Sequence, residues 1–209
     1  MRAAIETICR ALDLAPAESQ ISALVGYLEL LQRWNATYNL TAVRDPAEML
    51  VQHLADCLAV VAPLRRVLAQ GRLLDVGSGG GLPGVVIAVT LPEVDVTCVD
   101  SVGKKAAFIR QVAGALKLSN LHAVHSRIEG LRERGFDVVT SRAFASLADF
   151  TALTRGSLAA GGVWLAMKGR VPDDEIAALA PDIDVFHVEP LSVPGLDAQR
   201  CLVWMRLRP

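Results

Sequence analysis

Residues 73–84, LLDVGSGGGLPG, constrain this chain more than any other stretch. An apolar run leads into an aspartate, a loop with five glycines follows, and the apolar run VVIAV comes next. This order predicts a strand, a tight turn and a helix. Glycine lets the backbone adopt positive φ and lets a ligand approach the main chain, whose N–H groups face outward at a helix start. We therefore expect a flat, nucleotide-like ligand on this turn; a plain strand-to-helix turn is the alternative.

Two registers of this loop point to different ligands. Read from Gly79, the glycines follow the G-x-G-x-x-G pattern of dinucleotide-binding proteins, in which a pyrophosphate caps the helix N-terminus. Read from Asp75, the pattern is acidic-x-G-x-G-x-G, which looks like the motif of Rossmann-like methyltransferases that bind S-adenosylmethionine. The second register fits better, because Gly77 follows the apolar run directly. Pro83 has no N–H to offer a phosphate, but it suits the first turn of a helix.

The composition fits one soluble unit. The chain has 209 residues, 52% hydrophobic and 21% charged, which is enough for one α/β domain with a small appendage. No apolar run reaches transmembrane length, and the N-terminus lacks the apolar block of a signal peptide. The net charge of −1 gives no global basic field, so any nucleic acid must meet a local patch. We expect a cytoplasmic protein with no membrane contact.

The cysteines and histidines do not form a metal-binding pattern. The chain has no C-x-x-C pair, and its histidines are not spaced as ligands beside its cysteines, which are Cys9, Cys57, Cys98 and Cys201. We expect buried free thiols and no bound metal.

The first 70 residues have helical periodicity and no alternation typical of strands. Apolar residues recur at helical spacing over 16–34, which predicts an amphipathic helix. Asp45 then supplies an N-cap for a second helix, expected over 46–61. We therefore expect residues 1–70 to be a helical extension packed on a domain formed by residues 71–209.

From residue 73 the pattern changes to short apolar runs that alternate with helical segments. This alternation is typical of a parallel sheet covered on both faces. The expected strands are residues 73–76, 94–99, 121–124, 136–140, 163–167, 183–188 and 201–207. The expected helices are 82–90, 103–116, 147–158 and 173–179, with a short helix or turn at 128–134 and a turn at Gly161 and Gly162. The periodicity alone predicts a doubly wound α/β domain.

Several positions at the carboxyl ends of the expected strands are candidates for ligand contact, because that edge of an open α/β sheet faces the ligand crevice. Asp100 ends the second strand, 25 residues after Asp75, where an acidic side chain accepts hydrogen bonds from a ribose; capping the next helix is the alternative. Ile128 and Glu129 follow the third strand, where an apolar side chain packs on an adenine; for Glu129, a solvated turn is the alternative. Arg142 directly follows the fourth strand, among small residues.

Five motifs together resemble one protein family: WNATYNLTAVRDPAEMLVQHLADCL, LLDVGSGGGLPG, VDSVGKKAAFIRQV, SRAFASL and LAMKG. It is the glucose-inhibited division protein B family, whose members are 16S ribosomal RNA guanine-N7-methyltransferases. The resemblance covers residues 24–206. It implies a Rossmann-like class I methyltransferase fold, with a seven-stranded, mostly parallel sheet, helices on both faces and a final antiparallel hairpin. It also implies S-adenosylmethionine as cofactor and, as target, the guanine at position 527 in the 530-loop region of 16S RNA.

The resemblance also implies the cofactor site and the type of catalysis. The implied S-adenosylmethionine contacts are Gly77, Gly79, Leu82, Ile128, Glu129 and Arg142, with Asp100 at the ribose. Guanine N7 carries a free lone pair, so no base has to remove a proton before attack. We therefore expect catalysis by positioning and desolvation, with Arg142 as the one candidate for a catalytic residue.

An RNA substrate requires cations and a means to hold an unstacked base. Cations at or just after the ends of the third, fourth and fifth strands would gather at one rim of the sheet. With two side chains of the helical extension, the predicted RNA contacts are Arg127, Arg142, Lys168, Asn39 and His53. For His53, a core histidine with satisfied hydrogen bonds is the alternative.

Two other functions stay open at this point. One is an NAD-dependent oxidoreductase that uses the register from Gly79, and the other is a catalytically silent module that binds RNA or the ribosome. For the methyltransferase, the expected partner is 16S RNA or the small ribosomal subunit, and we expect a monomer.

Overall fold

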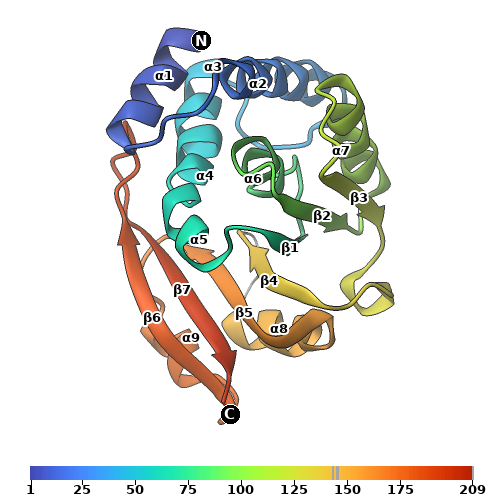
Figure 1. Ribbon diagram of the computed structural model, residues 1–209, viewed down its shortest axis with the longest axis vertical. Coiled ribbons are helices and arrows are strands. Elements are labelled where there is room, and N and C mark those ends of the chain that lie inside the picture. Colours follow the sequence, from blue (N-terminus) through green and yellow to red (C-terminus); the bar gives the residue numbers. More distant parts are fainter. Residues whose placement is uncertain (143, 145, 209) are drawn as a thin grey trace.

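The chain folds around one seven-stranded sheet, as the computed structural model of residues 1–142, 144 and 146–208 shows (Figure 1). The strand order is β3-β2-β1-β4-β5-β7-β6. The strands are β1 (Gly71–Val76), β2 (Val94–Asp100), β3 (Leu121–His125), β4 (Phe136–Ser141), β5 (Leu158–Lys168), β6 (Ile183–Leu191) and β7 (Arg200–Leu207). β1 to β5 run parallel, whereas β7 pairs antiparallel with both β5 and β6. The predicted fold class, with its final antiparallel pair, is confirmed.

Helices cover both faces of the sheet. They are α1 (Arg2–Ala11), α2 (Glu18–Tyr38), α3 (Pro46–Met49), α4 (Asp56–Leu58), α5 (Val61–Val67), α6 (Gly84–Thr90), α7 (Gly103–Ala115), α8 (Leu147–Thr154) and α9 (Asp173–Ala177). Successive side chains of a strand point to opposite faces. Leu73 accordingly packs in the core beneath α1, α2 and α4 to α7, while Leu74 packs in the core with α8 (Figure 1).

The helical extension lies on the same face as α6. α2 and α4 both pack on α6, and α1 packs on α2. The Asp45 side chain accepts hydrogen bonds from the N–H groups of Ala47 and Glu48, so the predicted N-cap is confirmed. The helix that follows includes a π-helical segment, Leu50–Ala55, between α3 and α4. Such wide turns are frequent at functional sites.

The helical stretch Pro46–Val67 corrects one expectation from the sequence. This helical stretch has 22 residues, and an 18-residue window within it has a mean hydropathy of 1.3, so it is long and apolar enough to cross a membrane by length and composition. The prediction that no run reaches that length is therefore wrong. In the fold, 67% of that window is buried, as in the core helix of a soluble protein.

The fifth strand also differs from its prediction. The preceding helix ends at Thr154 and β5 begins at Leu158, so the two glycines expected to form a turn lie inside the strand. The register between β4 and β5 shifts here, which makes room for extra residues in β5. Gly161 has a φ of +77°, and a Cβ at Gly162 would lie 2.9 Å from a backbone oxygen of β4. Glycine thus permits a bulge where the sequence indicated a turn.

Candidate functional site

The glycine loop connects β1 to α6 at the carboxyl edge of the sheet. Gly77 adopts a φ of +69°, and its N–H donates a hydrogen bond of 2.9 Å to the carbonyl of Val99 in β2. A Cβ added at Gly77 would meet no atom of the described residues within 4 Å. The loop therefore leaves open space above Gly77, as the approach of a ligand to the backbone requires.

The buried side chain of Asp75 anchors the other end of this loop, where α6 begins. Its Oδ2 accepts a hydrogen bond of 2.9 Å from the N–H of Gly84, the first residue of α6. A Cβ at Gly84 would lie 2.8 Å from that oxygen, so only glycine fits. Burial raises the pKa of the Asp75 carboxyl to about 7, against the opposing effects of the Gly84 hydrogen bond and the Arg142 charge. Asp75 is thus an anchor of the loop inside the core.

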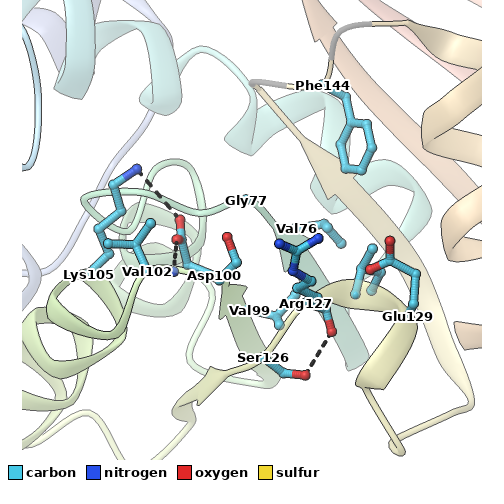
Figure 2. A pocket seen from close by; sticks show the side chains of 12 residues that line it. Val76, Gly77, Val99, Asp100, Val102, Lys105, Ser126, Arg127, Glu129 and Phe144 are labelled. Carbon is cyan, nitrogen blue, oxygen red and sulfur yellow. Dashed lines mark hydrogen bonds and ion pairs between the residues drawn. The ribbon is translucent and has the colours of Figure 1, made fainter.

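A cavity of about 500 Å³ opens over the ends of β1, β2 and β3. We call it the glycine-loop cavity; Gly77, Asp100, Ile128, Glu129 and Phe144 are among its lining residues. In the view of Figure 2, Asp100 and Lys105 lie on one side, Glu129 and Phe144 on the other, and Arg127 between them. The cavity thus combines an open backbone, a carboxylate and an apolar side chain, a combination suited to a nucleoside.

Asp100 joins the glycine loop to the start of α7. Its Oδ2 accepts from the N–H of Gly79 at 2.9 Å, its Oδ1 accepts from the N–H of Val102 at 2.8 Å, and Lys105 Nζ lies 3.9 Å away (Figure 2). Asp100 thus bonds to the loop and to the residue before α7, but α7 has no side-chain cap hydrogen bond, so the alternative role as a helix cap is wrong. A carboxylate has about four acceptor sites, so lone pairs remain for ribose hydroxyls.

A second cleft, of about 340 Å³, lies over the ends of β4 and β5 and the start of β7. We call it the arginine cleft; it is lined by Gln52, His53, Asp56, Arg142, Met167, Lys168, Gly169 and Arg200. The π-helical segment supplies the first two of these, and Asp56 follows it directly. The Gln52 carbonyl accepts a hydrogen bond of 3.2 Å from Nη1 of Arg142. The helical extension therefore completes a site at the sheet edge.

His53 is buried and only half satisfied. Its Nε2 lies 2.7 Å from Oγ1 of Thr41, whose backbone N–H bonds to the side chain of Asn35. Among the described residues, Nδ1 of His53 has no hydrogen-bond partner. Burial lowers the pKa of His53, and the Arg142 charge lowers it further, so the ring is neutral at pH 7. The prediction of a satisfied core histidine accounts for one ring nitrogen only.

The structure separates the predicted cofactor residues into two groups. Gly77, Asp100, Ile128 and Glu129 line the glycine-loop cavity. Of the others, Gly79 donates to Asp100, Leu82 is buried in the core, and Arg142 lines the arginine cleft. The SRAFASL motif is described only in part, because residues 143 and 145 lie outside the described residues.

The predicted RNA residues are also divided. Lys168 lines the arginine cleft together with Arg142 and His53, whereas Arg127 lines the glycine-loop cavity. Asn39 ends α2 in the left-handed region, at a φ of +48°, and its Oδ1 accepts a bond of 3.0 Å from Nη2 of Arg44. Their roles in RNA binding stay predictions.

Sequence reasoning missed two charged residues of the arginine cleft, Asp56 and Arg200. Asp56 is 3% exposed, and it contacts both Arg142 and Arg200. A lone acid within an apolar helical stretch indicates a buried charge with a partner, and this signal was present in the sequence. Arg200 lies at the end of a Pro- and Gly-containing loop, where no pattern singles it out. In the described part of the chain, no three His, Cys, Asp or Glu side chains gather as a metal site requires.

Comparisons with known proteins agree with this arrangement. Among solved structures, the fold resembles TrmN from Thermus thermophilus, with a TM-score of 0.59 and 23% identity over 72% of this chain and 48% of that one. It also resembles a SAM-dependent methyltransferase from Aquifex aeolicus, with a TM-score of 0.58 and 16% identity over 77% of this chain and 93% of that one. At these identities the likeness supports the fold alone.

The sequence relatives are much closer. Ribosomal RNA small subunit methyltransferase G of Acidovorax sp. (strain JS42) is 63% identical, over 94% of this chain and 91% of that protein. The protein of the same name from Leptothrix cholodnii is 62% identical, over 95% of this chain and 92% of that protein. The family model described as GidB, rRNA small subunit methyltransferase G, matches residues 20–203. The chain therefore belongs to the GidB family of ribosomal RNA small subunit methyltransferases.

Proposed function

We propose that this chain transfers the methyl group of S-adenosylmethionine to N7 of a guanine in 16S ribosomal RNA, at position 527 of the 530-loop region. The observation that carries the proposal is the glycine-loop cavity, adjacent to a cationic cleft, in a chain of the GidB family. The family match disfavours both the oxidoreductase and the silent module.

The lining of the glycine-loop cavity suits S-adenosylmethionine. The open space at Gly77 admits a ligand against the backbone, and the Asp100 carboxylate retains acceptors for ribose hydroxyls. Ile128 is half-buried and offers an apolar surface to an adenine, with Glu129 beside it. When bound, the cofactor supplies an electrophilic methyl group on a positively charged sulfur. Gly79 and Leu82 are proposed to affect cofactor binding through the shape of the glycine loop. Arg142 is proposed to affect it from the neighbouring arginine cleft.

The substrate side is proposed to be the arginine cleft. In the sheet register, Asp75 of β1 pairs with Thr140 of β4, and Ser141 pairs with Ala166 of β5. Adjacent strands lie about 4.8 Å apart, so the ends of β1, β4 and β5 form one row. The cavity and the cleft thus adjoin at the boundary of β1 and β4, where the strand order reverses. Ligands of open α/β sheets bind at such a point.

The chemistry proposed here requires little from the side chains. N7 of guanine already has a lone pair, so the protein has to hold the base, exclude water and neutralise the RNA phosphates. Arg142 and Lys168, in the cleft, supply positive charge, and Arg127 supplies it at the cavity. The neutral His53 and the more distant Asn39 are proposed to wall the base from the side of the helical extension. None of these groups has to transfer a proton.

Several further features belong to the same proposal. Residues 1–70 are an extension that packs on the core of residues 71–209, and the whole is one unit. The enzyme acts in the cytoplasm as a monomer, on 16S RNA or the small ribosomal subunit, and it requires neither metal nor membrane.

The test is methyl transfer from labelled S-adenosylmethionine to 16S RNA and to 30S subunits from cells that lack this protein. We expect label in one nucleotide, and mass spectrometry of RNA digests should identify it as 7-methylguanosine. Label on another base, or on another atom of guanine, would overturn the assignment of N7. NADH oxidation without methyl transfer would instead support the hypothesis of an NAD-dependent oxidoreductase.

A further inference from the structure

We propose that Arg200 binds a phosphate of the RNA substrate beside Arg142, and that the buried carboxylate of Asp56 holds both arginines in position. The inference rests on the proposed function and deepens it, because it assigns a phosphate site within the arginine cleft.

Asp56 lies between the two guanidinium groups. Its Oδ1 accepts a hydrogen bond of 2.9 Å from Nε of Arg200, and its Oδ2 lies 3.5 Å from Nη1 of Arg142. Each arginine has one further anchor, since Nη1 of Arg142 also donates to the Gln52 carbonyl and Nη1 of Arg200 donates to the carbonyl of Gln199. The two side chains are thus fixed by one carboxylate from the helical extension.

Packing gives little reason for this arrangement. The three residues come from segments far apart in the sequence: the helix after the π-helical segment, the end of β4 and the start of β7. Taking a carboxylate and two guanidinium groups out of water is costly, and apolar residues of similar volume often stabilise a fold equally well or better. Asp56 is only 3% exposed. A role for the arginines in binding accounts for keeping the three charges together.

The free donors of both arginines suit a phosphate. Within the described residues, Nη2 of Arg200 and both Nε and Nη2 of Arg142 donate to no acceptor, and each side chain is 26% exposed in the cleft. The cleft also holds a third cation, Lys168, which pairs with Glu175; among the lining residues Asp56 is the one carboxylate. Guanidinium groups match phosphate oxygens through their planar fork of N–H donors.

The first test is Arg200→Gln, with a transcript of 16S RNA as the probe. Binding is measured by fluorescence anisotropy at several salt concentrations. We expect about tenfold weaker binding and a slope of log K against log salt that is smaller by about one, as for the loss of one phosphate contact. S-adenosylhomocysteine affinity, measured by calorimetry, should stay within about twofold, because Arg200 does not line the glycine-loop cavity.

The matched control is Arg155→Gln. Arg155 pairs with Asp182 and precedes β5, whereas the cleft is at the other end of that strand. The Arg155→Gln variant loses the same charge as Arg200→Gln but at a site away from the cleft, so its salt slope should equal that of the wild-type protein. An unchanged slope in Arg200→Gln, or an equal decrease in both variants, would overturn the phosphate site.

Asp56→Asn tests positioning by the sign of its effect. Loss of a negative charge by itself should strengthen RNA binding. Asp182→Asn is the control, because it removes one negative charge elsewhere on the surface. Loss of the anchor should instead weaken RNA binding, while the affinity for S-adenosylhomocysteine reports that the variant is folded. Stronger or unchanged RNA binding in Asp56→Asn would overturn the role of Asp56.

Arg200→Lys covers the case in which Asp56→Asn does not fold. The ammonium keeps the charge but lacks the Nε donor that Asp56 binds. We expect Arg200→Lys to show the same salt slope as the wild-type protein but a weaker affinity for the RNA. An RNA affinity equal to that of the wild type would contradict the positioning of Arg200 by Asp56. Methyl transfer by the wild-type protein to the transcript or to 30S subunits separates the two proposals: without transfer to either substrate the proposed function fails, whereas transfer with unaffected RNA binding in the variants refutes only this inference.

Discussion

The hydroxyl of Tyr27 donates a hydrogen bond of 2.7 Å to the carbonyl oxygen of Gly80. Tyr27 lies in α2, and Gly80 lies in the loop that borders the glycine-loop cavity. Both groups are buried, and burial raises the pKa of Tyr27 well above its ordinary value, so the phenol stays a donor. The helical extension therefore supports the glycine loop directly.

Tyr27→Phe should destabilise the protein and weaken cofactor binding. The change leaves the buried Gly80 carbonyl without its phenol donor, which costs about 1 to 3 kcal/mol. We expect a lower free energy of urea unfolding and several-fold weaker binding of S-adenosylhomocysteine. Tyr38→Phe is the control, since Tyr38 is 44% exposed and its hydroxyl bonds to none of the described residues. If Tyr27→Phe binds S-adenosylhomocysteine as the wild type does, α2 does not support the loop.

Gly77→Ala separates backbone strain from loss of the ligand space. Gly77 and Gly161 both have positive φ, at +69° and +77°, and a Cβ at either would meet no described atom within 4 Å. An alanine at either position should therefore destabilise the fold by about 1 to 2 kcal/mol through strain. Only Gly77 lines the glycine-loop cavity, so only Gly77→Ala should abolish S-adenosylhomocysteine binding by calorimetry. Equal affinities in both variants would show that no ligand approaches Gly77.

Much of the fold was predictable because its signals are local. The glycine loop and the short apolar runs indicate a parallel sheet, and strand ends in such a sheet share one edge. That reasoning located Asp100, Ile128 and Glu129 at the glycine-loop cavity. The same reasoning could not place Arg142 in a different cleft from these three residues, because the separation of the cavity from the cleft depends on which strands become neighbours in the sheet.

The remainder depended on tertiary contacts. Asp56 and Arg200 are 144 residues apart, and no periodicity connects a helix in the extension with the first residue of β7. The bulge in β5 was read as a turn because paired glycines suit turns equally well. The π-helical segment has no pattern that distinguishes it from the α-helix around it.

The buried carboxyl of Asp75 should make stability depend on pH. Its pKa is about 7 in the folded state, because of burial, and about 3.9 in the unfolded chain. Between pH 4 and pH 7 the unfolded chain releases this proton while the folded protein retains it, so the free energy of unfolding falls as pH rises. The loss is on the order of 4 kcal/mol, since each pKa unit corresponds to about 1.4 kcal/mol.

Asp75→Asn isolates this effect from other titrations. The amide does not titrate, so the free energy of unfolding of the variant, minus that of the wild type, should increase between pH 4 and pH 7. Urea unfolding of both proteins at several pH values measures the difference. A constant difference would mean that Asp75 is not protonated in the folded state.

The ion pair between Lys168 and Glu175 should restrain RNA binding. Nζ of Lys168 lies 3.0 and 2.7 Å from the two carboxylate oxygens of Glu175, one of which also accepts the N–H of Leu147 at the start of α8. Glu175→Gln keeps an acceptor for that N–H but frees the ammonium. If Lys168 contacts RNA phosphates, this variant should bind 16S RNA several-fold more tightly at low salt and with a steeper salt dependence.

A double-mutant cycle makes the source of that gain measurable. In a Lys168→Gln background, Glu175→Gln should have little effect on RNA affinity, because the cation that it frees is absent. Asp173→Asn, at the exposed start of α9, removes the same charge without breaking the pair. An equal gain in Asp173→Asn would assign the effect to the general field of the acidic helix. A gain confined to Glu175→Gln, and lost without Lys168, identifies Lys168 as a cation that Glu175 holds until RNA binds.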